Sequence, residues 1–228
     1  MNPRAMKKSS SAVAKPNGDE KRREDVLRGA RKVFELHGLE GASMRMIAFA
    51  ARCTTGSIYP YFKGKEEIYA ELLSRSLEEY RQRLAADVER ATEPAVKFEA
   101  VVLAHFDHYV DRPEDMSLAL YLFNGLKPQG LTPELDARLN QQLESIMVIF
   151  RECVLALGGV NVKDADAEVG LHYSVLFGLL ILHHTKRTRV LHFEPRQVLK
   201  FHINNTVQRL ARGPQKVTAA RKAPRKKI

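Results

Sequence analysis

The sequence predicts an all-α protein, with an N-terminal three-helix domain of the helix-turn-helix type followed by a larger helical domain. Apolar residues recur at i, i+3, i+4 and i+7 through most of the chain, which is the spacing of one helix face. Residues that start and end helices separate these runs, and we find no convincing strand pattern. At 228 residues the chain has room for one small and one medium domain.

The first helix is expected from about Glu20 to His37. Its inward face is an apolar stripe made of Val26, Leu27, Ala30, Val33 and Phe34. Gly38 follows at the place where a glycine after the last helical residue ends a helix.

Two short helices joined by a tight turn are expected between Ser43 and Phe62. Ser43 can cap the first, whose inward stripe is Met44, Ile47, Ala48 and Ala51. Thr54 can cap the second, which Ile58 and Phe62 would anchor inward. The second helix begins with short side chains, as a helix that approaches base edges in the DNA major groove must. Pro60 is tolerable there because the helix is only two turns long.

The run from Val26 to Ile68 resembles the DNA-binding domain of the TetR family of bacterial transcriptional regulators. The features that carry the resemblance agree in order and spacing. They are Phe34, Gly38, Ser43, the pair Ile47-Ala48, the run Gly56-Ser57-Ile58-Tyr59, Phe62 and the pair Lys65-Glu66.

The resemblance implies contacts with double-stranded DNA. It places Ser43, Tyr59, Tyr61 and Lys65 at phosphates, and it places Arg45, Thr55, Gly56, Ser57 and Pro60 at bases. The candidate DNA-binding set also includes Thr54, the expected cap. Lys65 begins the helix that, in the family, links the DNA-binding head to the ligand-binding body.

Two positions depart from the family pattern. Arg52 stands in the turn where the family usually has glycine, and a left-handed backbone there would cost about 1–2 kcal/mol. Arg52 would recover part of this cost by reaching a phosphate. Met46 stands where the family often has an acid, so Ser43 loses a capping-box partner.

Six further helices are expected, as in the family's usual plan. Proline or a capping residue opens most of them. They run from Lys65 to about Ala91, from Pro94, from Pro113 to near Gly130, from Thr132-Pro133 to Gly158-Gly159, from a cap at Asp164 to about Arg187, and from Glu194-Pro195 to Gly213-Pro214.

The helix from Asp164 is apolar on nearly every side between Val169 and Leu182. A helix of this kind must be covered on more than one side. The last helix carries an apolar stripe that includes Val198, Phe201 and Leu210. In the family these two helices form a four-helix interface with their copies, which predicts a homodimer. The alternative is that one chain buries both faces.

The C-terminal body is expected to hold a pocket for a small-molecule effector. The candidate lining consists of His105, Phe106, Tyr109, Leu122, Phe123, Met147, Phe150, His172, Tyr173 and Phe177. Each of these is also consistent with plain core, and a histidine among apolar neighbours is often a hydrogen-bonded core residue. The mostly apolar lining favours a hydrophobic or amphipathic ligand.

We expect no metal site and no cofactor. His183 and His184 are adjacent on a helix and point about 100° apart, so they do not readily share one ion with His192. We see no phosphate-binding loop, nucleophile elbow or paired-histidine zinc motif, and therefore no enzyme signature. Cys53 is consistent with a redox sensor or with a small apolar filler of the turn.

The net charge of +10 lies in the two ends of the chain: residues 1–23 carry +5, residues 213–228 carry +6, and residues 24–212 carry −1. The basic ends are consistent either with solvated, disordered tails or with sequence-independent attraction to DNA. No secretory signal is seen, and the apolar stretch from Val175 to Leu182 is too short to cross a bilayer, so we expect no membrane partner and a cytoplasmic location.

The sequence therefore predicts a dimeric, ligand-responsive transcriptional regulator, most often a repressor. The expected domains are a disordered basic tail at 1–19, a helix-turn-helix DNA-binding domain at 20–66, an effector-binding and dimerisation domain at 67–212, and a second basic tail at 213–228. One alternative is a dimeric DNA-binding protein without an effector. Another is a helical ligand-binding or enzymatic protein whose head has lost DNA binding.

Overall fold

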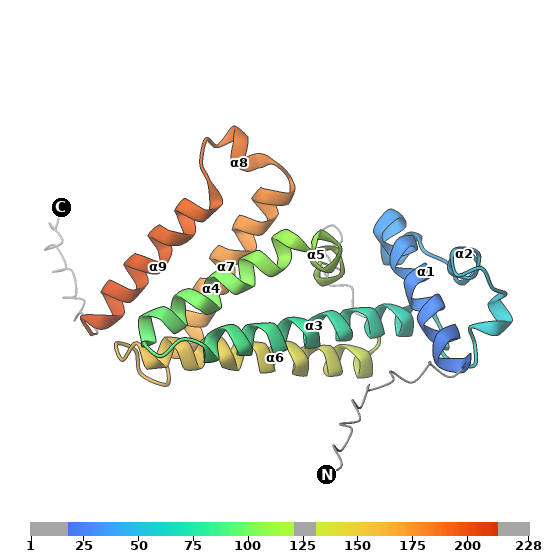
Figure 1. Ribbon diagram of the computed structural model, residues 1–228, viewed down its shortest axis with the longest axis horizontal. Helices are drawn as coiled ribbons and strands as arrows, with labels where there is room; N and C mark the ends of the chain where they lie inside the picture. Colours follow the sequence, from blue (N-terminus) through green and yellow to red (C-terminus); the bar gives the residue numbers. More distant parts are fainter. Residues whose placement is uncertain (1–17, 121–130, 214–228) are drawn as a thin grey trace, which may run out of the picture. The chain divides into compact units, whose positions relative to one another are not determined.

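The computed structural model describes residues 18–120 and 131–213, and all regular structure in these ranges is helical, which confirms the predicted all-α class (Figure 1). The chain divides into two compact units, Met1–Leu72 and Leu73–Ile228, at a point inside α3. The elements are α1 Gly18–Gly41, α2 Met44–Ala50, the 3₁₀ helix η1 Thr55–Ser57, α3 Lys65–Glu89, α4 Pro94–Asp111, α5 Pro113–Ala119, α6 Pro133–Ala156, α7 Ala165–His184, α8 Arg187–Val190 and α9 Pro195–Ala211.

The first unit has the small apolar core that the sequence predicts. Phe34, Ile47, Ile58 and Phe62 are each at most 5% exposed. The ring of Phe34 packs edge-on against Tyr69 of α3, with 4.9 Å between ring centroids. These contacts join α1, α2, the turn after η1 and the start of α3 into one body.

The end of α1 differs slightly from the prediction. Gly38 has the left-handed φ of 65° expected of a helix-ending glycine, but another helical turn follows it and reaches Gly41. The ammonium of Lys65 donates to the carbonyls of Leu39 and Glu40 in this turn and of Ala42 just after it, which stabilises the extra turn.

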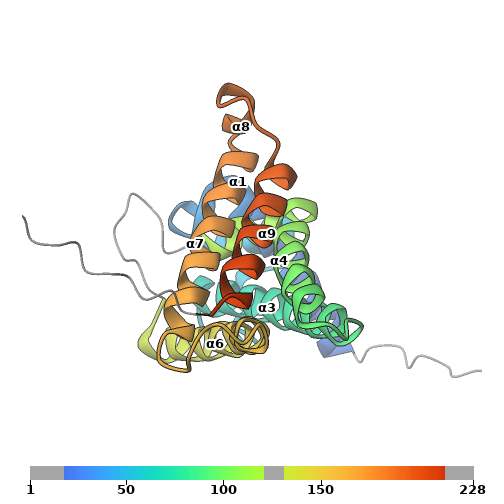
Figure 2. The ribbon, with the colours of Figure 1, turned by 90° about the vertical axis from the view of Figure 1, so that its left-hand side faces the viewer.

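Helix α4 is the centre of the second unit. It packs against α5, α6, α7 and α9, and α7 and α9 lie beside each other in both ribbon views (Figures 1 and 2). Phe98, Val102, Phe106 and Tyr109 of α4 are at most 7% exposed. Their spacing of three or four residues places them on one side of the helix.

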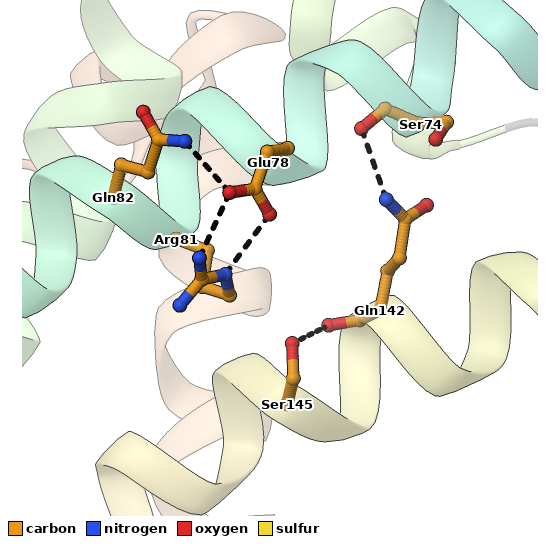
Figure 3. A network of polar contacts seen from close by, with 6 residues as sticks. All are labelled: Ser74, Glu78, Arg81, Gln82, Gln142 and Ser145. Carbon is orange, nitrogen blue, oxygen red and sulfur yellow. Dashed lines mark hydrogen bonds and ion pairs between the residues drawn. The ribbon is translucent and has the colours of Figure 1, made fainter.

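Polar side chains join α3 to α6 at one place in the second unit (Figure 3). The amide of Gln142 donates to the carbonyl of Ser74 at 3.3 Å, across the two helices. Glu78 accepts from Arg81 at 2.8 and 2.9 Å and from Gln82 at 2.7 Å within α3. Hydrogen bonds from Arg81 and Gln82 lower the pKa of Glu78 to about 2.

The predicted helix starts at Pro94, Pro113 and Thr132-Pro133 are confirmed. The Thr132 hydroxyl accepts from the Leu135 N–H at 3.4 Å. The predicted side-chain cap at Asp164 is wrong. Its backbone is helical, with φ −93° and ψ −12°, and its carboxylate accepts from the Asn161 amide at 2.7 Å.

The predicted end of α7, at about Arg187, is also wrong. The helix ends at His184, where the hydroxyl of Thr185 donates to the carbonyl of Ile181 at 2.7 Å. Lys186 then has a left-handed backbone with φ 57°, and the short helix α8, which the sequence did not predict, follows.

Helix α7 is longer than the apolar stretch considered in the sequence. Its 20 residues make it the one helix in the described ranges with the length and composition to cross a membrane. The core helix of a globular domain can have the same length and composition. Leu176 and Leu180 are fully buried, whereas Leu171 is half exposed, so α7 packs on one side and leaves an apolar side open.

Several predictions lie outside the described residues. These are the pocket candidates Leu122 and Phe123, the end of the third C-terminal helix near Gly130, and most of both basic tails.

Candidate nucleic-acid interface and effector site

The candidate DNA-binding residues all belong to the first unit, and none of the ten is buried. The exposed members are Arg45, Thr54, Gly56, Tyr59 and Pro60, and the half-buried members are Ser43, Thr55, Ser57, Tyr61 and Lys65. They gather at the start of α2, on η1 with the turn after it, and at the start of α3.

Ser43 caps α2 as predicted. Its backbone is extended, and its hydroxyl accepts from the Met46 N–H at 3.3 Å. The cap fixes the start of α2 and leaves Arg45 exposed on the first turn. A helix that starts there also presents free N–H groups and a partial positive charge to an anion.

The turn between α2 and η1 contains the strained residue that the sequence predicted. Arg52 has a left-handed φ of 54°, where a side chain costs about 1–2 kcal/mol relative to glycine. Its N–H donates to the Phe49 carbonyl at 3.1 Å, and the Cys53 N–H donates to the Ala48 carbonyl at 2.9 Å. These bonds hold the turn tight and the Arg52 side chain exposed.

The predicted two-turn recognition helix is wrong in its form. The chain forms a single 3₁₀ turn at Thr55–Ser57 and then a hydrogen-bonded turn as far as Phe62. Pro60 explains this, because it lacks an N–H to bond a preceding carbonyl and disfavours helical backbone at Tyr59. The predicted anchors hold, since Ile58 is 0% and Phe62 is 4% exposed.

Thr54 caps this 3₁₀ turn as predicted. Its hydroxyl accepts from the Ser57 N–H at 3.3 Å and lies 2.8 Å from the Ser57 hydroxyl. Each hydroxyl can donate once and accept twice, so the pair keeps capacity for a base or a phosphate. Tyr59, two residues after Ser57 in the sequence, is 55% exposed.

Two of the predicted phosphate contacts have protein partners. The Tyr61 hydroxyl donates to the Asp19 carboxylate at 3.0 Å, and this bond raises the pKa of Tyr61 above its ordinary value. The Lys65 ammonium donates to the carbonyls of Leu39, Glu40 and Ala42 at 2.9, 3.3 and 3.2 Å. An ammonium has three N–H donors, so a phosphate contact from Lys65 would replace one of these bonds.

A group of cations that the sequence motifs did not indicate lies with Arg52 and comes from α1. Arg22, Arg28 and Lys32 line a pocket of about 430 Å³ with Arg52. The available signal was the spacing of Arg28 and Lys32, four residues apart on one exposed side of a helix.

The second unit contains a buried cluster of aromatic and histidine side chains. The hydroxyl of Tyr80 lies 2.6 Å from Nδ1 of His105. The rings of Tyr109, Phe150 and Tyr173 lie 5.2, 5.6 and 5.8 Å from the His105 ring. The structure thus brings together candidates from α4, α6 and α7 and adds Tyr80 of α3, which the sequence analysis missed.

The cluster is uncharged near neutral pH. Burial, with a smaller effect of His108, lowers the pKa of His105 to about 3, and burial raises the pKa of Tyr80 well above its ordinary value. His108 is 6% exposed, and its Nε2 lies 3.8 Å from the buried carboxylate of Asp115. Neither ring nitrogen has a hydrogen-bond partner among the described residues. A buried polar atom of this kind provides a place for a polar group of a ligand.

The other pocket candidates lie apart from this cluster or at its edge. Phe177 stacks on Tyr173 at 6.0 Å, and Phe106 faces His183 at 6.0 Å. Met147 and Tyr173 line an open pocket of about 520 Å³ between α6 and α7.

His172 belongs to a different network, which joins α7 to α9. Its Nδ1 lies 2.9 Å from Nε2 of His202, and its Nε2 lies 3.7 Å from a carboxylate oxygen of Glu168. Glu168 accepts two bonds of 2.7 Å from Arg209. His172 is therefore a hydrogen-bonded core residue in this structure.

Within residues 18–120 and 131–213, no three His, Cys, Asp or Glu side chains are grouped as a metal site. The ring of His184 lies instead with Nε2 at 2.9 Å from the Tyr109 carbonyl. Cys53 is half buried and Cys153 is buried, and both are free thiols.

Comparison with known proteins agrees with this arrangement. Residues 26–72 match the family model of bacterial regulatory proteins, tetR family. The HTH-type transcriptional regulator HbdR of Aromatoleum sp. (strain CIB) is 31% identical over 111 residues, which cover 49% of this chain and 48% of HbdR. The HTH-type transcriptional repressor KstR2 of Mycolicibacterium smegmatis is 32% identical over 92 residues, 40% of this chain and 45% of KstR2.

The chain spans about half the length of these curated relatives. The structure of the transcriptional regulator FadR from Bacillus subtilis in complex with stearoyl-CoA superposes with a TM-score of 0.60 at 19% identity, over 84% of this chain and 99% of that one. This similarity shows a shared fold of both parts of the chain. Through residues 26–72, the chain belongs to the tetR family of bacterial regulatory proteins.

Proposed function

We propose that this protein is a homodimeric transcriptional regulator that binds double-stranded DNA and acts as a repressor released by a small hydrophobic or amphipathic effector. The observation that carries the proposal is the exposed polar surface from Thr54 to Tyr59, held on a capped turn by the buried side chains of Ile58 and Phe62. Short polar side chains on a rigid support are suited to reading base edges in the major groove.

In this proposal residues 20–66 bind DNA, and residues 67–212 bind the effector and dimerise. Arg45, Thr55, Gly56, Ser57 and Pro60 face bases. Ser43, Thr54, Tyr59, Tyr61 and Lys65 position the backbone phosphates, directly or by holding the surface in shape. Such a protein is not an enzyme and works in the cytoplasm, where the bacterial chromosome lies.

The buried cluster around His105 supports an effector of mixed character. Its rings offer apolar contact, while Tyr80, His105 and His108 offer uncharged hydrogen-bonding groups. FadR from Bacillus subtilis, which shares the fold, was solved with stearoyl-CoA. Acyl compounds are therefore a sensible first class of effector to test.

The mechanism follows from linkage. Suppose that the effector binds better to a conformation that holds the two heads at the wrong spacing. The bound effector then lowers the affinity for DNA by some factor, and bound DNA lowers the affinity for the effector by the same factor. Helix α3, which includes residues of both units, would carry the change.

The test begins with selection of bound sequences from random duplexes. The wild type should enrich a two-fold symmetric site. Arg45→Ala and Thr55→Ala should each relax preference at one or two positions per half-site, at a cost of about 1–3 kcal/mol. Arg138→Ala, which removes an exposed charge from α6, is the control and should leave the selected site unchanged. An unchanged site for both head variants would refute the base-reading assignment.

The effector is tested by release of the labelled operator with fatty acids, acyl-CoA compounds and aromatic acids. Phe177→Ala should raise the concentration needed for release without changing operator affinity. Val96→Ala, at a side chain 49% exposed on α4, is the control. Operator binding that no compound affects would favour the effector-independent DNA-binding protein.

A further inference from the structure

One pocket of the first unit is lined mainly by positive charge. It has a volume of about 430 Å³ and lies where the middle of α1 meets the end of α2. We call it the α1–turn cleft, and its lining is Arg22, Asp25, Arg28, Gly29, Lys32, Ala50, Ala51 and Arg52.

The floor of the α1–turn cleft is backbone. Gly29 is buried, and a Cβ at this position would lie 2.7 Å from the Ala51 nitrogen and 3.0 Å from the Ala50 carbonyl carbon. Only a glycine lets α1 approach the end of α2 this closely. Arg52, which has a left-handed φ of 54°, directly follows Ala51 and also lines the cleft.

The walls carry four basic side chains and one acid. Asp25 pairs with Arg28, so the lining keeps a net charge of +3. All four basic residues are exposed, although residues 24–212 as a whole carry only −1. The neighbouring Arg23 is not part of the cleft, because it pairs with Glu71 at 2.9 Å and lies over the Phe62 ring.

We propose that the α1–turn cleft binds a phosphate group, and that its source is the DNA backbone beside the groove that Thr54–Tyr59 enters. This inference rests on the proposed function. A guanidinium matches phosphate with two parallel N–H donors, and the cleft offers three guanidinium groups and one ammonium.

The position of Arg52 favours the DNA backbone over a free phosphate. Arg52 precedes Thr54 by two residues, so their Cα atoms are at most about 7 Å apart. The major groove is about 12 Å wide, so a backbone wall stands roughly 6 Å from its centre. A long side chain at Arg52 therefore reaches the wall when Thr54 lies in the groove. Lys32 and Arg28 extend the positive surface along α1, away from the bases.

The experiment measures affinity for the operator and for one random duplex at several salt concentrations. Arg52→Gly removes the guanidinium and also the left-handed strain, so its melting temperature should rise while its DNA affinity falls. Each lost phosphate contact lowers the salt slope by about 0.9, so the affinity ratio of wild type to variant should shrink about 3.5-fold between 50 and 200 mM salt. Lys32→Ala should give a second, separate decrease of the same kind.

The control is Lys21→Ala, which removes an exposed charge from α1 outside the cleft. It should leave the salt slope unchanged, and the selected base preference should be the same for all variants. A slope change in Lys21→Ala equal to that in Lys32→Ala would mean that only overall charge matters and would overturn the cleft. A changed base preference in Arg52→Gly would also overturn it.

A second arm adds inorganic phosphate or pyrophosphate to the protein without DNA and follows the backbone amide signals of Ala51 and Arg52. The inference expects no saturable shift below millimolar concentration. Saturable binding that Arg52→Gly abolishes, without any effect on DNA, would assign the cleft to a free phosphate instead. If the wild type selects no DNA sequence at all, the proposed function fails. If it does but the cleft variants keep wild-type slopes, only this inference fails.

Discussion

At the scale of single residues, Lys65 shows that a residue expected to contact DNA can also bond groups of its own chain. Sequence resemblance places Lys65 at a DNA phosphate, whereas in the structure its ammonium bonds three carbonyls between Leu39 and Ala42. The two roles are compatible if Lys65 holds the segment between α1 and α2 in the shape that DNA binding needs.

Lys65→Met separates these roles. It keeps much of the aliphatic stem but leaves the carbonyls without their donor, which should destabilise the first unit by about 1–3 kcal/mol. Operator affinity should fall with little change in its salt slope, as judged by denaturant unfolding and by binding at several salt concentrations. A slope lowered by about 1 with unchanged stability would instead assign Lys65 to a phosphate. Lys63→Met, two residues earlier and exposed, is the control.

Three buried histidines predict a loss of stability in mild acid. Burial lowers the pKa of His105 to about 3 and the pKa values of His108 and His172 to about 4. The folded state then binds fewer protons than the unfolded state between about pH 6.5 and 4. The free energy of unfolding should therefore be unaffected by these groups above pH 6.5 and should fall as the pH drops through that window.

The measurement is urea unfolding at pH 7.5, 6.5, 5.5 and 4.5. Each pKa unit corresponds to about 1.4 kcal/mol, so His172, which is fully buried, contributes up to about 3 kcal/mol. His172→Gln should make the decline between pH 6.5 and 4.5 shallower. The carboxylates Glu78 and Glu168 have lowered pKa values and lose their contribution only below about pH 4.5, outside this window. A wild-type stability that is constant from pH 7.5 to 4.5 would contradict the histidine assignment.

At the scale of elements, the sequence predicted best what is decided locally. The predicted caps at Ser43 and Thr54 depend on one hydroxyl and a nearby N–H, and both form. Thr132, predicted only as a helix start, makes a bond of the same kind. The form of the segment around Pro60 was wrong, because one proline shifts the balance between a helix and a turn. The short helix α8 was missed because a left-handed Lys186 has no signal in its residue type.

The candidate site follows the same division. The exposed head residues could be predicted because a short ordered motif fixes them. The aromatic cluster was predicted only in part, since Tyr80 joins it through the packing of α3 against α4 and no local pattern marks that contact. The α1–turn cleft likewise depends on how closely α1 approaches α2 at Gly29.

Gly159 provides a test of element packing in the second unit. A Cβ at this position would lie 1.6 Å from the Leu210 carbonyl oxygen and 2.3 Å from its carbon, so α9 would have to shift. Gly159→Ala should lower the free energy of unfolding by about 1–3 kcal/mol or more, measured by urea unfolding. Gly170→Ala, inside α7 with open space around it, should be neutral or stabilising by about 0.5–1 kcal/mol. Equal effects of the two variants would show that α9 does not pack this closely.

At the scale of the whole molecule, the unpaired apolar surface of α7 and α9 predicts assembly. Leu171 of α7 is 50% exposed and Phe201 of α9 is 71% exposed. Residues of both helices line a pocket of about 440 Å³. A second copy would cover this surface, and a two-fold axis would then relate the two heads, as a palindromic operator requires. Leu180, in contrast, is fully buried within its own chain and contributes to the core.

Phe201→Asp tests the assembly. At the centre of an interface the new carboxylate would lose its water without gaining a partner, at a cost of several kcal/mol. The variant should sediment as a monomer, keep its helical content, and lose operator affinity because the heads no longer bind together. Val190→Asp, at a residue 73% exposed on α8, should remain dimeric and bind normally. Leu180→Asp should unfold the second unit instead of yielding a folded monomer. A Phe201→Asp protein that still sediments as a dimer would place the interface elsewhere, and a monomeric wild type would remove the two-fold arrangement on which release by an effector depends.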